Sequence, residues 1–406
     1  WKSLDYVAGW FLKAADYGTQ SKAISAFVTT NSICQGVQVP ILWPIIFSTG
    51  HQIAFAHTSF KWANLASHNA GVMVAIVAIT HERNKSRTLF SIDDRGETVA
   101  KIVENLNAYL VTGKGINISP TRMSISGCAY MDLGNMPKDG GNFLLSFSEA
   151  EALTKAEPSS EKYVFDFVGS QEFVKGIVRR CLWIEDAQVE DARKSQEIAR
   201  RLEGVRRMRL ASDAESTRAY ADRPHRFKQI QGRGLKSTIV VPKVSSERRL
   251  YLPVGLLSRH SIVSDNAFAL YDAPLWNMAL IASRLHLIWI ATVCGKLETR
   301  YRYSNTLGWN TFPVLTLTEK NKADLTSCAE NILLAREAHF PATIADLYDP
   351  ENMPADLRAA HDRNDEVLER IYIGRRFKND TERLEKLFEL YTKMTEAKTG
   401  SKTIGV

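Results

Sequence analysis

Residues 72–79 have the sequence VMVAIVAI, an uninterrupted apolar run that is rich in β-branched side chains. A run of this length without polar alternation is typical of a strand that is buried on both faces of a sheet. Before it, residues 4–17 have apolar side chains at helical spacing, and residues 24–30 and 52–57 have the composition of strands. A helix and three strands in this order predict the closing part of an α/β sheet.

The pattern changes at about residue 93, where Gly-rich turns and short strand-like runs begin. Helices are predicted at residues 101–110, 190–210 and 275–293, and strands at residues 238–244 and 250–254. After Pro313 the chain is mostly helical, with apolar side chains at i, i+3, i+4 and i+7 near its end. The predicted fold class is therefore α/β plus α+β, with parts at residues 1–92, 93–312 and 313–406.

The composition is that of a globular protein. The 406 residues are 45% hydrophobic and 24% charged, which excludes a fibrous or mostly disordered chain. The longest apolar run has nine residues, whereas a membrane span needs about 20, so we expect a soluble protein with no membrane partner. The five cysteines are scattered and the nine histidines show no metal-ligand spacing. This usage favours a reducing cytoplasm and predicts neither a disulfide framework nor a structural metal.

Positive charge is concentrated in one segment. Residues 193–236 contain thirteen Lys/Arg and five Asp/Glu, whereas the whole chain has a net charge of only +7. One basic segment on a nearly neutral chain favours contact with a polyanion such as nucleic acid. A solvated helix surface is the alternative, and charge alone does not separate the two.

Polar and aromatic residues near the predicted strands could line a ligand site. Asn31 directly follows the strand at residues 24–30, and open α/β sheets place ligands at the carboxyl ends of their strands. Phe60 and Trp62 lie between two predicted strands, where aromatic rings can stack on a flat ligand such as an unpaired base. The alternatives are that Asn31 caps the next helix and that the two rings cover the core.

Two short motifs in the middle of the chain have the chemistry of DNA contacts. The sequence SSERR lies at residues 245–249 between two predicted strands, and RYRYS at residues 300–304 alternates arginine with tyrosine. Alternation puts both arginines on one face of a strand and both tyrosines on the other. Guanidinium groups suit phosphate or the guanine edge, and a carboxylate can accept a hydrogen bond from cytosine. A salt-bridged surface turn and a solvent-facing strand are the alternatives.

Common enzyme signatures are absent from the sequence, which contains no GxSxG, Walker loop, GxGxxG or HExxH. It also lacks an Asn/Asp-Pro-Pro-Tyr/Phe tetrapeptide. From the residues alone, the prediction ends at an α/β plus α+β protein whose basic middle could bind nucleic acid.

Several segments, taken together and in order, resemble the MmeI-type (type IIL) restriction–modification enzymes, which are gamma-type amino-methyltransferases of DNA. The segments are LDYVAGWFLKAADY (4–17), AFVTTNSICQG (26–36), IAFAHTSFKWANLA (53–66), GVMVAIVAI (71–79), VGSQEFVKGIVRRCLWI (168–184), VPKVSSERRLYLPVG (241–255), GKLETRYRYSNTLGWNTFPV (295–314) and LLAREAHFPATIADLYDPENMPADLRAAHDRND (333–365). The resemblance spans nearly the whole chain.

The resemblance implies a site-specific adenine-N6 DNA methyltransferase that uses S-adenosylmethionine and turns its target base out of the duplex. Phe60 or Trp62 would then stack on the flipped base, and Asn31 would line the DNA-facing side of the sheet. The three parts would be the end of a Rossmann-like class I methyltransferase domain (1–92), a target recognition domain (93–312) and a helical C-terminal domain (313–406).

Double-stranded DNA is the partner that this resemblance implies. We expect phosphate contacts and base contacts to come from different residues. Phosphate contacts fix the position of the protein on the duplex, whereas base contacts read the sequence. Phosphate contacts are expected from Arg206, Arg207, Arg209, Arg226 and Lys228. Base contacts are expected from Arg179, Arg180, Glu247, Arg248, Arg249, Arg300 and Arg302, with Ser246 suited to either role. It is equally open that SSERR and RYRYS are scaffold.

The family's cofactor-binding glycine motif and catalytic tetrapeptide do not occur in this sequence. We therefore expect S-adenosylmethionine to bind mainly upstream of Trp1, in another half of the same polypeptide, and the chain alone to be inactive. Two alternatives stay open: a stand-alone sequence-specific DNA-binding module, and a phage-defence methyltransferase without a nuclease.

Overall fold

The computed structural model describes residues 4–62, 72–82, 86–92, 96–113, 115–297 and 299–400. Its N-terminal part is a five-stranded sheet, called the first sheet below, with the order β1-β3-β2-β4-β5. The strands are β1 (Ser25–Thr30), β2 (Gln52–Lys61), β3 (Met73–Thr80), β4 (Arg87–Ile92) and β5 (Thr98–Val103). β3 is antiparallel to both of its neighbours and mostly buried, so the apolar run at residues 72–79 is confirmed as an interior strand.

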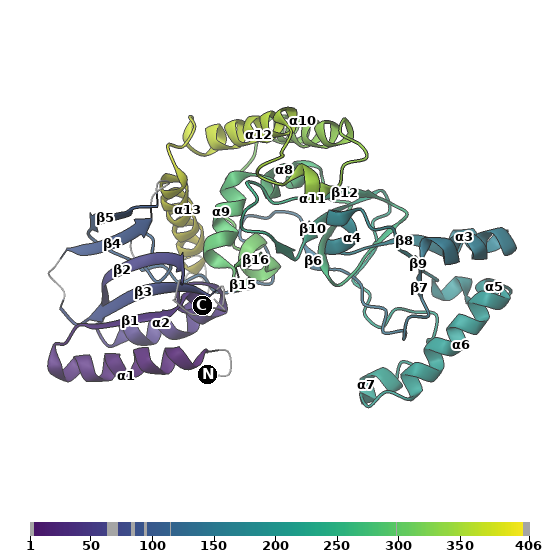
Figure 1. Ribbon diagram of the computed structural model, residues 1–406, viewed down its shortest axis with the longest axis horizontal. Helices are drawn as coiled ribbons and strands as arrows, with labels where there is room; N and C mark the ends of the chain where they lie inside the picture. Colours follow the sequence, from purple (N-terminus) through teal and green to yellow (C-terminus); the bar gives the residue numbers. More distant parts are fainter. Residues whose placement is uncertain are drawn as a thin grey trace.

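Two helices, α1 (Tyr6–Ser21) and α2 (Val39–Ser48), cover one face of the first sheet (Figure 1). α1 faces the sheet with Ala8, Phe11 and Ala15, which lie about one or two helical turns apart. The Phe11 ring lies 4.7 Å from the ring of Phe27 in β1. The predicted helix at residues 4–17 is therefore confirmed, and its apolar stripe is the face that packs on the strands.

The helix predicted at residues 101–110 is wrong. Residues 98–103 are instead strand β5, which pairs with β4 along its whole length, so the first sheet extends past the predicted boundary at residue 92. After β5, the Asn107 Oδ1 accepts hydrogen bonds from the backbone N–H groups of Tyr109 (2.9 Å) and Val111 (3.2 Å). A side chain that binds nearby backbone in this way stabilises a turn in competition with a helix.

The middle of the chain forms two further sheets. The larger has the order β12-β10-β14-β6, and the smaller, called the central sheet below, has the order β11-β16-β15. Their strands are β6 (Asp132–Leu133), β10 (Ser237–Pro242), β11 (Val244–Ser245), β12 (Gly255–Ser258), β14 (Ala267–Tyr271), β15 (Lys296–Leu297) and β16 (Arg300–Arg302). The strand predicted at residues 238–244 is confirmed as β10 and the start of β11.

The strand predicted at residues 250–254 is wrong, although Leu252 and Val254 are buried as a strand would require. The carbonyl of Leu250 accepts from Arg284 Nη1 (3.3 Å), and that of Val254 accepts from Arg336 Nη1. Side chains thus take the place of a partner strand for these two carbonyls.

The single helix predicted at residues 275–293 is two helices, α8 (Trp276–Ile281) and α9 (Arg284–Val293). The break occurs at Ser283, whose hydroxyl accepts from the backbone N–H of His286 at 3.2 Å and so caps α9. Apolar periodicity continues through the break, which explains why the pattern resembles one helix.

A separate lobe, called the distal lobe, contains a sheet of order β13-β8-β9-β7. Its strands are β7 (Leu144–Leu145), β8 (Val164–Val168), β9 (Arg180–Leu182) and β13 (Ser261–Val263), and its helices are α3 (Phe147–Ala156), α4 (Ser170–Lys175), α5 (Val189–Ala192), α6 (Gln196–Leu210) and α7 (Glu215–Arg218). The predicted helix at residues 190–210 is divided, because Ser195 caps α6 at the N–H of Ile198 (3.1 Å). A core that includes Trp183, Leu202 and Phe227 holds the lobe together.

The C-terminal part is helical as predicted, with α10 (Glu319–Glu337), α11 (Ile344–Leu347), α12 (Ala355–Ile373) and α13 (Asp380–Gly400). Figure 1 shows α13 between the first sheet and α9, and the ring of Phe388 lies 5.5 Å from that of Trp289. Hydrophobic residues of the first sheet, the middle and these helices form one continuous core. Among the helices in the described ranges, none is long and apolar enough to cross a membrane.

Candidate nucleic-acid interface

A cavity of about 920 Å³ lies where the first sheet, residues 109–112, the end of α9 and the start of α13 meet. Its lining includes Asn31 directly after β1, Thr58 from β2, Lys296 from β15, and Lys378 and Asp380 from the segment that begins α13. The cavity is therefore built by parts of the chain that are far apart in the sequence.

Asn31 lies at the carboxyl end of β1, as predicted, and lines this cavity. Its Oδ1 accepts a hydrogen bond from Gln35 Nε2 (3.0 Å), and its buried Nδ2 has no acceptor among the residues described. The alternative that Asn31 caps a helix is not supported, because the cap residue of the following short helix is Thr30.

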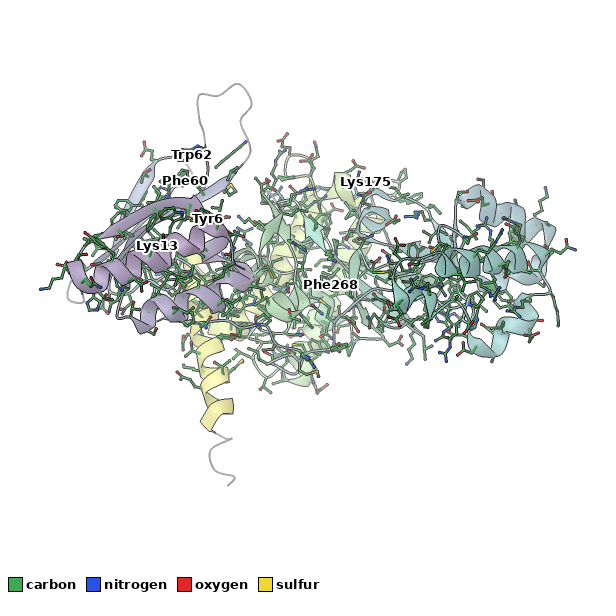
Figure 2. All side chains as sticks on the ribbon, turned by 90° about the horizontal axis from the view of Figure 1, so that it is seen from below. Tyr6, Lys13, Phe60, Trp62, Lys175 and Phe268 are labelled. Carbon is green, nitrogen blue, oxygen red and sulfur yellow. The ribbon has the colours of Figure 1, made fainter. Side chains whose placement is uncertain are left out.

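Phe60 and Trp62 lie in and just after β2 rather than on a loop, because β2 continues to Lys61. The Phe60 ring packs against His57 with 4.8 Å between ring centres, whereas Trp62 is 40% exposed. Figure 2 shows the two residues close together at one end of the first sheet. Thr58 and Ser59 of the same strand line the cavity, so the aromatic pair lies beside it rather than in its lining.

The central sheet brings together the two motifs that the sequence singled out separately. Val244 pairs with Arg302, and Ser245 pairs with Tyr301, across β11 and β16. Arg300 and Arg302 are exposed while Tyr301 between them is half-buried, so the predicted alternation of faces is confirmed. The SSERR loop therefore lies beside the two arginines of RYRYS.

The four candidates in the SSERR loop differ in their contacts. Ser246 Oγ accepts from the backbone N–H of Arg248 (3.2 Å), and the Arg248 guanidinium forms an exposed ion pair with Glu351 (2.6 Å). Arg249 Nη1 donates to Ser245 Oγ (3.3 Å), and burial lowers the pKa of Arg249. Glu247 is exposed. We call Arg248, Arg249, Arg300 and Arg302 the central arginine group.

A second set of candidates lies in the distal lobe and is called the distal basic group. It consists of Arg179, Arg180, Arg206, Arg207, Arg226 and Lys228. Most members have partners within the lobe: Arg179 pairs with Glu172 (2.9 Å), Arg180 with Asp166, Arg206 with Glu203 (3.8 Å) and Arg226 with Glu185 (2.7 Å). Lys228 Nζ donates to Ser216 and Thr217 (2.9 and 2.8 Å).

Arg207 is exposed on α6 and has no ion pair within the described part of the chain. It is therefore the member of the group whose charge is best available to a ligand. Figure 1 shows α6 at the opposite end of the molecule from the first sheet, with β15 and β16 between them, so the two groups are spatially separate.

The prediction that Arg209 contacts phosphate is wrong. Its side chain is fully buried, and its guanidinium donates to the backbone carbonyls of Pro137, Lys138, Tyr220, Arg223 and Arg226 at 2.7–3.2 Å. All of its hydrogen-bonding capacity is used within the lobe. Arg209 thus joins three segments of the lobe. From the sequence alone, this arginine could not be distinguished from its exposed neighbours.

Sequence reasoning also missed Lys296 and Lys378, both of which line the cavity. Lys296 lies opposite Tyr301 in the β15–β16 hairpin, with its Nζ 5.9 Å from the centre of the tyrosine ring. The sequence of residues 296–302 could have indicated a hairpin that includes Lys296. The prediction from the sequence covered only its second strand, with Arg300 and Arg302. Lys378 carries no comparable local signal.

Three family models match the chain in series. They describe the DNA-methyltransferase domain of MmeI (residues 1–91), its target recognition domain (residues 112–316) and its C-terminal domain (residues 317–398). The chain belongs to the MmeI family of DNA methyltransferases. DNA methyltransferase A of Bacillus subtilis (strain 168) is 38% identical over 395 residues, which are 97% of this chain and 44% of that protein.

A solved structure of the MmeI family has the same overall arrangement. The type IIL restriction–modification enzyme MmeI, solved in complex with DNA, matches with a TM-score of 0.84 and 36% identity over 97% of this chain and 53% of its own. The chain thus spans about half the length of the relatives that it matches. In the described ranges, no three His, Cys, Asp or Glu side chains are grouped so that they could hold a metal ion.

Proposed function

We propose that this chain is the DNA-recognition and partial catalytic portion of a site-specific adenine-N6 methyltransferase of a restriction–modification system. The observation that carries the proposal is the central arginine group, in which strand β16 and the loop after the neighbouring strand β11 bring four guanidinium groups of the target recognition segment together. Planar, multivalent donors of this kind suit base edges and phosphates. The proposed domain boundaries are those at residues 92 and 312, with strand β5 from beyond the first boundary completing the first sheet.

The target base is proposed to leave the duplex and to stack on an aromatic ring beside the cavity. Trp62 is the better placed of the two candidates, because it is 40% exposed while the ring of Phe60 packs on His57. Asn31 supports this location, since its buried Nδ2 has no acceptor among the described residues and could bind one provided by a base.

The residues that line the cavity do not fit S-adenosylmethionine, the methyl donor of this class. Its sulfonium centre is positively charged, the three carboxylates of the lining are each paired with a cation, and Lys296 and Lys378 would repel it. We propose that the cofactor is bound mainly by residues outside this sequence, in the part of the polypeptide that relatives carry in addition, and that this chain alone does not methylate DNA.

The exposed outer edge of the first sheet favours the proposal that another part of the same polypeptide packs against it. β1 is an edge strand of this sheet, and no described strand pairs with its outer side. Val28 on this strand is 54% exposed, and Tyr6 on the covering helix α1 is 86% exposed (Figure 2). Unpaired edges and exposed rings are features that proteins normally cover, so another strand and helix are proposed to pack here.

Mapping of modified bases tests the proposal. DNA from cells that express the intact protein should contain N6-methyladenine at one short recognition sequence and nowhere else above background. Methylated cytosine at such a sequence would refute the adenine assignment. The absence of any modification, together with sequence-specific binding, would favour a stand-alone DNA-binding module.

A further inference from the structure

Three lysines and three carboxylates line the cavity, but they are not paired one to one. Three acidic side chains contribute to the lining, Asp380, Glu382 and Glu385, and each is already engaged. Asp380 pairs with Arg383 (2.9 Å) and Arg284 (2.5 Å), Glu382 with Arg375 (2.5 Å), and Glu385 with Lys101 (3.7 Å). The acidic residues of the cavity therefore have cationic partners of their own.

Lys296 and Lys378 are the cations of the lining that are left over. Neither lies within ion-pair distance of a carboxylate in the part of the chain that the structure describes, although the charge of the exposed Lys378 helps to lower the pKa of Glu382. Lys296 is half-buried against the Tyr301 ring, and Glu247 is the acidic group that influences it most. Burial lowers the pKa of Lys296, which means that the folded protein solvates its charged form poorly.

The half-buried ammonium group of Lys296 lacks an ion-pair partner among the described carboxylates, which costs stability, and an anionic ligand would reduce that cost. Lys378 is exposed and adds a second positive charge to the lining. The cavity volume of about 920 Å³ lies within the range of about 300–1,000 Å³ that is usual for ligand sites. Lys296 comes from the segment matched by the target recognition model and Lys378 from that matched by the C-terminal model. The ligand would therefore bridge two domains.

We propose that Lys296 and Lys378 together bind a backbone phosphate of DNA at this cavity. The inference rests on the proposed function, in which the DNA strand passes beside Asn31 at the same cavity. Phosphate is the anion that a DNA strand offers at every nucleotide, and a lysine binds it as a point charge. The two lysines act as positioning residues, because they hold the strand rather than contact the reacting atoms.

The first experiment measures the binding of a fluorescent random-sequence duplex to the intact protein as a function of salt. Lys296→Met keeps most of the length of the side chain and removes its charge, and Lys378→Gln does so at the second position. Each variant should bind the duplex more weakly, on the order of tenfold, and should reduce the salt slope by about one. Because both lysines hold one phosphate, the double variant should lose less than the two single effects together.

Lys320→Gln is the matched control, because Lys320 lies on α10 and pairs with Asp324 (2.6 Å) outside the cavity. It should leave the salt slope at the wild-type value. Lys296→Arg keeps the charge and should restore most of the affinity that Lys296→Met loses.

Thermal unfolding separates a ligand-binding lysine from a structural one. Removing an uncompensated buried charge should leave the midpoint of Lys296→Met unchanged or raise it, while affinity for DNA falls. A lowered midpoint would show that Lys296 stabilises the fold and would overturn the proposal. An unchanged salt slope in folded Lys296→Met and Lys378→Gln would overturn it as well.

A free nucleotide offers the same phosphate chemistry, so adenosine monophosphate is titrated in parallel. Lysine-dependent binding of the mononucleotide without a lysine effect on duplex binding would overturn the assignment to the DNA strand. If the wild-type protein binds no duplex at low salt, the proposed function itself fails, and this outcome is distinct from a failure of the lysine assignment.

Discussion

Ser245 of β11 lies directly opposite Tyr301 of β16 in the central sheet. This pairing places the SSERR loop beside the exposed arginines that flank Tyr301, although more than fifty residues separate the two motifs in the sequence. Since neighbouring strands lie about 4.8 Å apart, side chains from both motifs can reach the same few base pairs.

Arg302→Ala should affect sequence discrimination. Arg302 is exposed and pairs through its backbone with Val244, so its loss should leave the sheet intact. If it reads a base, affinity for the recognition site should fall by about 1–3 kcal/mol, and one position of the site should become degenerate. Fluorescence anisotropy with the site and its single-base variants measures both effects. An equal loss on all sequences would assign Arg302 to phosphate instead.

Arg207→Ala should weaken binding to every duplex alike. The side chain is exposed on α6, in the basic segment, so a phosphate contact is the expected role. The salt slope of binding should fall by about one. Arg363→Ala on α12, which removes an arginine that pairs with Glu366 (3.0 Å), serves as the control and should not change it.

Arg209→Met should destabilise the distal lobe, in contrast to Arg207→Ala. The carbonyls of Pro137, Tyr220 and Arg223 also accept from a backbone N–H, so the substitution leaves those of Lys138 and Arg226 without a donor among the described residues. The free energy of unfolding should fall by about 2–6 kcal/mol, because each unsatisfied buried acceptor costs about 1–3 kcal/mol. Urea unfolding monitored by tryptophan fluorescence measures the loss. Wild-type stability of Arg209→Met would refute the structural role of this residue.

Trp62→Ala should weaken the capture of a displaced base. A duplex in which the target adenine faces a mismatched base already has that adenine unpaired, so stacking accounts for more of the binding. Affinity of the intact protein for this duplex should fall by about 1–3 kcal/mol, the value of one base–aromatic stack. Phe60→Ala should have a smaller effect, since its ring packs on His57. The reverse order would identify Phe60 as the stacking residue.

Asp365→Asn should remove a pH dependence of stability. Asp365 is buried on α12, accepts from the Arg284 N–H (2.7 Å), and has its pKa raised to about 7 by burial. The unfolded chain releases this proton near pH 4, with an ordinary aspartate pKa of about 3.9. The folded protein therefore holds an extra proton between about pH 4 and 7, and its stability should fall as the pH rises through that window.

The asparagine variant keeps the acceptor without the charge. Its free energy of unfolding should exceed that of the wild type above pH 7 and should equal it near pH 4. The gain should be a few kcal/mol at most, since one pKa unit corresponds to about 1.4 kcal/mol. Urea titrations at both pH values measure the difference. Glu366 on the same helix is half-buried and pairs with Arg363 (3.0 Å) and Arg370 (2.7 Å), so Glu366→Gln should show no such gain. A constant difference between Asp365→Asn and the wild type at all pH values would contradict the account.

Some of the fold could be predicted because the signal is local. The apolar run of β3 has strands on both sides, so burial on two faces produces an unmistakable pattern. The helix predicted at residues 101–110 failed because the pairing of β5 with β4 and the turn around Asn107 depend on contacts that periodicity does not encode. At Ser283 a single cap residue divides a continuous apolar pattern.

At the candidate site, too, some features follow from the local sequence and others depend on contacts between distant segments. Alternation at residues 300–303 predicted the faces of β16, but only the fold reveals that Ser245 is its neighbour. Arg209 and Arg207 have equivalent local sequences, and the acceptors that bury Arg209 come from residues 137–138 and 220–226. The unbalanced charge of Lys296 likewise depends on which carboxylates other segments bring to the cavity.

The central claim is that the target recognition segment of this MmeI-family chain contacts DNA through its central arginine group. Amide hydrogen exchange of the intact protein, with and without saturating duplex DNA, tests it most directly. Residues 244–249 and 296–302 should exchange more slowly in the complex, because the duplex covers both. Unchanged exchange in these two segments, with protection confined to other surfaces of the bound protein, would contradict the claim.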